Sequence, residues 1–155
     1  MAVSMKPSIT DTDGALKIED QLCFALYSTS RAITKQYAII LSELGITYPQ
    51  YLALLVLWQE DGLLVQDIAT QLELDSATVT PLVQRLEKMC LVCRQRSKID
   101  ERKVHVYLTD DGKALFQKAL TVPHQLTCRT GIDEETAKRL IAQTSAIKGF
   151  ILQNN

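Results

Sequence analysis

The stretch LDSATVTPLVQRLEKM, residues 74–89, decides the fold, because it carries the start signal and the apolar face of one helix. Asp75 is a good N-cap. Pro81 lies within the first two turns, where its missing amide donor costs little. Apolar residues recur at helical spacing and predict the buried face: Val79, Leu82, Val83 and Leu86. The sequence therefore predicts a helix that packs one side against a core.

The segments on either side of this helix predict two more helices and a hairpin. YLALLVLWQED (51–61) is nearly all apolar, and with Pro49 near its first turn it predicts a buried helix that stops at Asp61 and Gly62. LVQDIATQLEL (64–74) predicts a short helix with apolar residues facing inward: Val65, Ile68, Ala69 and Leu72. Residues 91–109 alternate roughly in twos around KIDERK, which predicts a two-stranded hairpin.

Helix, short turn, helix and basic hairpin is the order of a winged helix-turn-helix, expected here over about residues 50–110 of a mainly α chain. The second helix of such a unit enters the major groove, which is about 12 Å wide. Between Gln84 and His105 there are seven basic and three acidic residues, although the whole chain carries a net charge of −1. The expected DNA-binding residues are Ser76, Thr78, Thr80, Gln84, Arg85, Arg94, Arg96 and Arg102. The alternative is that the hydroxyls only cap the helix and face solvent.

Long amphipathic helices flank this unit. One is predicted from Ile18 to Gly45, another from Thr109 to Cys128 with a bend at Pro123, and a last one after the N-cap Asp133. Their apolar stripes lie at the two ends of the chain, so we expect a homodimer built from helices at about 16–45 and 111–153. A monomer with its ends packed on each other is the alternative.

The rest of the chain predicts a single domain over residues 16–155 behind a flexible arm, residues 1–15, that lacks the features of a secretory signal. No apolar run is long enough for a membrane span. We therefore expect a cytoplasmic protein with reduced cysteines.

Cys90 and Cys93 form a C-x-x-C pair, but zinc needs four ligands and no second pair exists, so no metal and no cofactor are expected. Cys23 by itself is either a small core residue or a reactive thiol.

Several stretches resemble the MarR family of dimeric winged-helix regulators: YPQYLALLVLW (48–58), LDSATVTPLVQRLE (74–87) and DERKVHVYLTDDG (100–112). LCFALY (22–27) and ITYPQYL (46–52) resemble, more narrowly, its organic hydroperoxide resistance regulators (OhrR) of the two-cysteine type, and the resemblance covers Leu16 to Leu152. It implies a recognition helix at about 76–88 and a wing in which Asp100 orients Arg102. Where the family usually has glycine after the recognition helix, this chain has Cys90, and a left-handed conformation there would strain a non-glycine residue.

The resemblance also implies a role for the remaining cysteines. Cys23 matches the peroxide-sensing thiol, Tyr37 and Tyr48 match tyrosines that hydrogen-bond its sulfur, and Cys128 matches a cysteine that forms a disulfide between subunits. The expected function is a repressor, not an enzyme, that binds a pseudo-palindromic DNA operator when reduced and releases it when an organic hydroperoxide oxidises Cys23. Two alternatives stay open: a MarR-type repressor released by a non-covalent aromatic ligand, and a thiol peroxidase.

Overall fold

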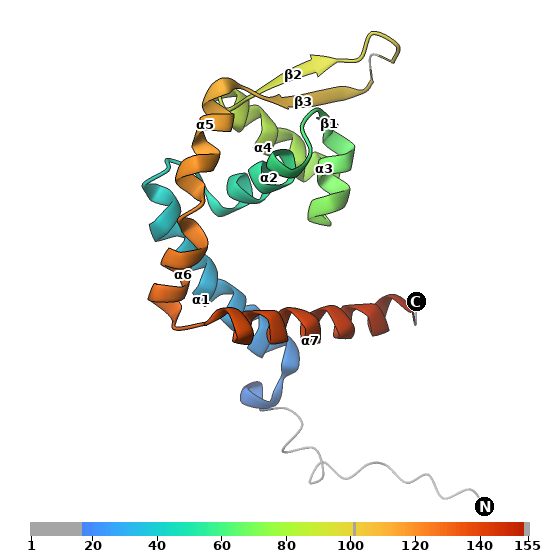
Figure 1. Ribbon diagram of the computed structural model, residues 1–155. Helices are drawn as coiled ribbons and strands as arrows, with labels where there is room; N and C mark the ends of the chain where they lie inside the picture. Colours follow the sequence, from blue (N-terminus) through green and yellow to red (C-terminus); the bar gives the residue numbers. More distant parts are fainter. Residues whose placement is uncertain (1–16, 101, 154–155) are drawn as a thin grey trace, which may run out of the picture. The chain divides into compact units, whose positions relative to one another are not determined.

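The computed structural model describes residues 17–100 and 102–153, in two compact units, residues 1–35 and 36–155 (Figure 1). The expected N-terminal arm, residues 1–15, lies outside the described residues. The single domain expected over residues 16–155 stays a prediction. Within the two described ranges, no helix combines the length and the apolar character that crossing a membrane requires.

The described part of the first unit is almost entirely helical. A short 3-10 helix, η2 (Ile18–Asp20), is followed by α1 (Leu22–Ser42), which continues into the second unit. In the first unit, α1 exposes several large apolar side chains: Leu22, Phe24, Leu26 and Tyr27. The chain leaves α1 through Gly45, whose positive φ of 70° is a conformation that glycine adopts at little cost.

The second unit contains the predicted helix-turn-helix. Its helices are α2 (Tyr48–Gln59), α3 (Val65–Leu72) and α4 (Ser76–Lys88). The four apolar residues predicted to form the inner face of α4 are all buried, in a core with Leu41, Leu54, Leu57 and Ile68. The buried polar side chain in this core is Gln50, whose Oε1 accepts a hydrogen bond from the backbone N–H of Thr47 at the start of α2. The helix predictions for this region are confirmed.

The wing has one strand more than predicted. Strands β2 (Val92–Arg96) and β3 (Val104–Leu108) form the expected antiparallel hairpin, which extends away from the helices in Figure 1. A third strand, β1 (Leu63–Leu64), pairs with the other edge of β3, so the strand order is β1-β3-β2. Asp61 holds this edge, because its Oδ1 accepts a hydrogen bond from the backbone N–H of Leu108 at 2.7 Å.

The helix predicted from Thr109 to Cys128 is broken rather than bent. Instead of one helix there are two, α5 (Asp110–Ala119) and α6 (Val122–Thr130). Pro123 explains the break, because in a continuous helix its ring would clash with the carbonyl of the residue four positions earlier, Ala119, where α5 ends. The last helix, α7 (Glu134–Gln153), begins as predicted after Asp133, whose Oδ1 accepts from the N–H of Thr136. No residue of α7 is buried within this chain.

Helix α4 is followed by a left-handed residue that is not glycine. Cys90 has a φ of 58°. Its N–H bonds to the carbonyl of Glu87 at 2.9 Å, and the N–H of Leu91 bonds to the carbonyl of Leu86 at 3.0 Å. This pair of bonds is the Schellman arrangement, in which the residue at the Cys90 position is usually glycine. The strain anticipated at Cys90 is therefore present.

Replacing Cys90 with glycine is expected to raise the free energy of unfolding by about 1 kcal/mol, because the left-handed conformation penalises a residue with a Cβ atom. Chemical denaturation at a fixed protein concentration measures the change. The matched control is Lys88→Gly, within the right-handed turn just before, which should lose about 1 kcal/mol. Equal losses in both variants would show that Cys90 stores no strain.

Candidate nucleic-acid interface and thiol residues

The N-terminus of α4 is held by a carboxylate cap. Asp75 Oδ1 accepts from the backbone N–H of Thr78 at 2.7 Å, and Oδ2 accepts from the Thr78 hydroxyl at 2.9 Å. These bonds, the backbone bond first, lower the pKa of the Asp75 carboxyl. The Thr80 hydroxyl donates to the Ser76 carbonyl at 2.6 Å. The hydroxyls of Thr78 and Thr80 thus cap and brace the helix, and their oxygen lone pairs stay available as acceptors.

The exposed face of α4 carries longer polar side chains. Gln84 and Arg85 lie on this face, opposite the buried stripe. Gln and Arg side chains have the geometry for two parallel hydrogen bonds to adenine and guanine edges, respectively. Both side chains therefore face solvent, where a DNA duplex could reach them. Their role in DNA contact stays a prediction.

The wing tip is organised by Asp100. Its Oδ1 accepts from the backbone N–H of Arg102 at 3.1 Å, and its carbonyl accepts from the N–H of Lys103 at 2.9 Å. The Ser97 hydroxyl accepts from the N–H groups of Ile99 and Asp100. The bond from the Arg102 N–H to the Asp100 carboxylate agrees with the expectation that Asp100 orients Arg102, which stays a prediction.

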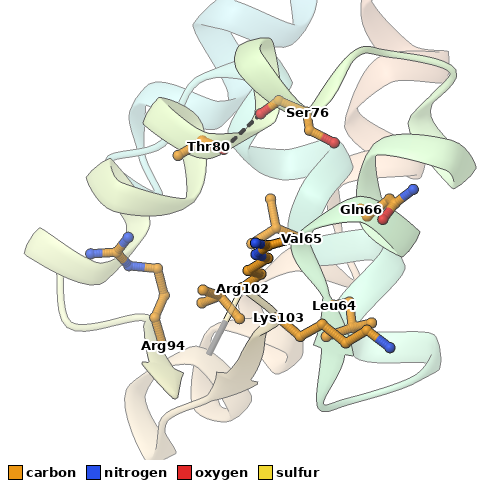
Figure 2. A pocket seen from close by; sticks show the side chains of 9 residues that line it. Leu64, Val65, Gln66, Ser76, Thr80, Arg94, Arg102 and Lys103 are labelled. Atoms are coloured by element: carbon orange, nitrogen blue, oxygen red, sulfur yellow. Dashed lines mark hydrogen bonds between the residues drawn. The ribbon is translucent and has the colours of Figure 1, made fainter. Parts of the chain in front are cut away.

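A cavity of about 250 Å³ lies between α3, α4 and the wing (Figure 2). The wing contributes Arg94, Arg102 and Lys103, and α4 contributes Ser76 and Thr80. The remaining lining comes from Leu64, Val65, Gln66 and Val104. The tertiary structure thus brings together two helix hydroxyls and three cations that are up to 27 positions apart in the sequence. Lys103 and Gln66 were not among the predicted DNA-binding residues, although Lys103 is one of the seven basic residues between Gln84 and His105 and Gln66 lies within the predicted helix 64–74.

The tyrosines of α1 and α2 form an aromatic cluster in the second unit. The ring centroids of Tyr37 and Tyr48 are 4.6 Å apart, and those of Tyr37 and Tyr51 are 5.9 Å apart. Burial, and secondarily the neighbouring Tyr48 and Tyr51, raises the pKa of Tyr37 to about 12, and burial also raises the pKa of Tyr48. Both phenols therefore stay protonated at neutral pH and keep an O–H donor. Tyr51 was not predicted as part of this cluster.

The four cysteines are free thiols. Cys23, Cys90 and Cys128 are exposed, and Cys93 is half-buried in β2. The sulfur of Cys128 lies 3.9 Å from both ring nitrogens of His124, one helical turn earlier in α6. Cys23 belongs to the first unit, so its contact with the two tyrosines stays a prediction. Over residues 17–100 and 102–153, no three His, Cys, Asp or Glu side chains gather in a way that could hold a metal ion.

The raised pKa of Tyr37 predicts a loss of stability in alkali. The folded protein keeps the phenol neutral up to pH about 12, whereas the unfolded chain releases the proton near pH 10. The stability contributed by neutral Tyr37 is thus complete below pH about 10 and falls as the pH rises toward 12. Urea unfolding should show that the wild type loses about 1 kcal/mol more than Tyr37→Phe over this range, a value reduced for solvent screening. Tyr27→Phe, on an exposed ring, should keep the wild-type loss.

Similarity to known proteins agrees with this arrangement. The family described as "Transcriptional regulator SarA/Rot" matches residues 35–119, which include the helix-turn-helix and the wing. The chain is 46% identical, over 132 residues, to the organic hydroperoxide resistance transcriptional regulator of Bacillus subtilis (strain 168). That alignment covers 85% of this chain and 88% of the relative. The chain belongs to the MarR family of winged helix-turn-helix transcriptional regulators. It is thus grouped with DNA-binding regulators and not with enzymes, as predicted.

Solved structures extend the similarity to the fold. The MarR-family chain matches a structure titled "Structure of reduced AbfR bound to DNA" with a TM-score of 0.72 and 33% identity, over 90% of this chain and 99% of that one. It also matches "Structure of Disulfide formed AbfR" with a TM-score of 0.62 and 32% identity, over 93% and 99% of the two chains. The predicted fold class, mainly helical with a small β wing, is confirmed.

Proposed function

We propose that this MarR-family protein is a peroxide-sensing repressor: as a reduced homodimer it binds a pseudo-palindromic DNA operator, and it releases the operator when an organic hydroperoxide oxidises Cys23. The observation that carries the proposal is the exposed Cys23 in a chain 46% identical to a regulator named for organic hydroperoxide resistance. DNA binding is supported by the relative whose reduced form was solved on DNA, and a thiol switch by the disulfide form of the same protein.

The chemistry begins at the sulfur of Cys23. Its thiolate attacks one oxygen of the hydroperoxide, so an S–O bond forms and the O–O bond breaks. The leaving alkoxide takes up a proton and departs as an alcohol, and the sulfur becomes a sulfenic acid. The phenols of Tyr37 and Tyr48 stay protonated, and an O–H donor that reached the Cys23 sulfur would favour its thiolate. The apolar neighbours Leu22 and Phe24 favour an organic hydroperoxide over hydrogen peroxide.

The second step uses Cys128 of the other subunit. Its thiolate attacks the sulfenic sulfur, an S–S bond forms, and the S–O bond breaks as hydroxide leaves and is protonated to water. The exposure of the Cys128 thiol supports this step, since the attacking sulfur must be accessible. A cytoplasmic location suits the cycle, because thiols rest there in the reduced form.

The homodimer is supported by apolar surface that each unit leaves exposed. In the second unit, α7 exposes Leu140, Ile141 and Leu152, and in the first unit α1 exposes Leu22 and Phe24. Exposed apolar patches of this kind mark interaction surfaces. Two identical chains then offer one recognition helix to each half of a palindromic operator.

The test is a binding titration with a duplex that the reduced protein selects from a random-sequence library. An organic hydroperoxide should weaken binding roughly a hundredfold, and hydrogen peroxide at the same concentration should do so much less. On non-reducing gels the oxidised wild type should run as a covalent dimer and Cys128→Ser as a monomer. Unchanged DNA binding after hydroperoxide treatment would contradict the proposal, and equal sensitivity to both oxidants would contradict the selectivity.

A further inference from the structure

An acidic residue, Glu87, lies at the C-terminal end of α4, and its carboxylate is bound to Arg94 of the wing. Glu87 Oε2 accepts from Nε of Arg94 and lies 2.7 Å from its Nη2, and Oε1 accepts from the Arg94 backbone N–H at 3.1 Å. Both side chains are about one-third exposed. The hydrogen bond from the Arg94 side chain, and then its backbone bond, lower the pKa of the Glu87 carboxyl. One carboxylate thus fixes both the strand β2 and the guanidinium.

The guanidinium held in this way lies at the edge of the basic cavity. Figure 2 shows the Arg94 side chain running from β2 toward α4, and Arg94 lines the cavity together with Arg102 and Lys103. A guanidinium has five N–H donors, and the Nε and Nη2 contacts with Glu87 leave others for a ligand. The described cavity lining has three cations and no carboxylate, which suits a phosphate group.

The presence of Glu87 needs a physical reason. A carboxylate near the DNA backbone repels phosphates, so on charge alone its removal would tighten DNA binding. A flexible Arg94 would lose side-chain entropy on each encounter with DNA, whereas one already bound to Glu87 has lost it on folding. Repulsion of phosphates by Glu87 weakens DNA binding, whereas the prior ordering of Arg94 strengthens it. The three contacts between Glu87 and Arg94 favour the ordering effect.

We propose that Glu87 is a positioning residue for DNA binding, which holds Arg94 at the edge of the cavity so that its guanidinium binds a backbone phosphate of the duplex. This role concerns the reduced protein and goes beyond the peroxide response. It also makes Arg94 a phosphate contact rather than a reader of bases.

The experiment compares full-length, reduced Glu87→Gln with the wild type on the library-selected duplex, over a series of salt concentrations. If Glu87 positions Arg94, the variant should bind DNA about tenfold more weakly, because the charge-assisted hydrogen bonds from Arg94 to the backbone phosphate are lost. The dependence of binding on salt concentration should also become less steep, by about one phosphate contact. Simple charge removal predicts tighter binding with the same salt dependence. The control is Asp67→Asn, an exposed acid on α3, which should bind as the wild type does or slightly tighter.

Three further variants test whether Glu87 acts through Arg94. Arg94→Gln should reproduce the weaker binding and the shallower salt dependence, and the double variant should lose no more than either single one. Arg94→Lys keeps the charge but not the planar fork and should also weaken binding. Equal or tighter binding by Glu87→Gln, or additive losses in the double variant, would overturn the proposal. No oxidant is used, so this result is independent of whether hydroperoxide releases the operator.

Discussion

Gly112→Ala is expected to lower the free energy of unfolding by about 3 kcal/mol, the largest stability change that we predict for a single methyl group in this protein. A Cβ atom at Gly112 would lie 2.0 Å from the carbonyl oxygen of Leu91 and 3.1 Å from its carbonyl carbon. These are backbone atoms just before β2, so no side-chain rotation relieves the clash. The first turn of α5 would have to move away from the wing.

The bonds around Gly112 increase the cost of such a movement. Its N–H donates to the Thr109 hydroxyl at 3.1 Å, and its carbonyl accepts from Nε1 of Trp58 at 2.9 Å. The Leu91 carbonyl also accepts from the N–H of Thr109 at 3.1 Å. A shift of α5 that frees the Leu91 carbonyl therefore strains bonds to both α2 and the wing.

Chemical denaturation at a fixed protein concentration measures this effect. The matched control is Gly149→Ala in α7, where an added Cβ meets nothing within 4 Å. That variant should gain about 1 kcal/mol from helix propensity. If the two alanine variants changed stability in the same direction, the close approach of Gly112 to Leu91 would not control the packing of α5.

Cys23→Ser is expected to abolish the response to organic hydroperoxide, a loss of roughly a hundredfold in regulation, while leaving the affinity of the reduced protein for DNA unchanged. A serine hydroxyl has nearly the size of the thiol but does not form the nucleophilic anion that attacks peroxide. The helix that carries it stays intact, because residue 23 is exposed and its side chain fills no core space.

The measurement is the operator titration with and without hydroperoxide, on Cys23→Ser and on the control Cys90→Ser. Cys90 is also an exposed thiol, so its serine variant should keep the full wild-type release. Release of the operator by Cys23→Ser in hydroperoxide would remove Cys23 from the mechanism and favour a repressor that responds to a non-covalent ligand. Sustained hydroperoxide consumption by the wild type with a dithiol reductant would instead favour the thiol peroxidase.

Local features of the sequence predicted most of the helix-turn-helix. The Asp75 cap, the buried stripe of α4 and the stop near Gly62 depend on neighbours within one or two helical turns, and the structure has all three. The left-handed conformation of Cys90 was raised by the resemblance to the MarR family, which usually has glycine at this position, and the structure has it. The strand β1 was missed because two residues are too few for an alternating pattern.

The sequence by itself determined the helices of the helix-turn-helix, their buried faces and the cap of α4, since these depend on residues that are adjacent along the chain. Only the tertiary structure decided the contacts between elements: Gly112 against the Leu91 carbonyl, Tyr37 against Tyr48, and Glu87 bound to Arg94. Such contacts require two segments to approach within a few ångströms, and that distance is set by the packing of the whole core. The motif LDSATVTPLVQRLE predicted a helix that presents polar residues to DNA, and the folded chain showed that its final glutamate binds the wing.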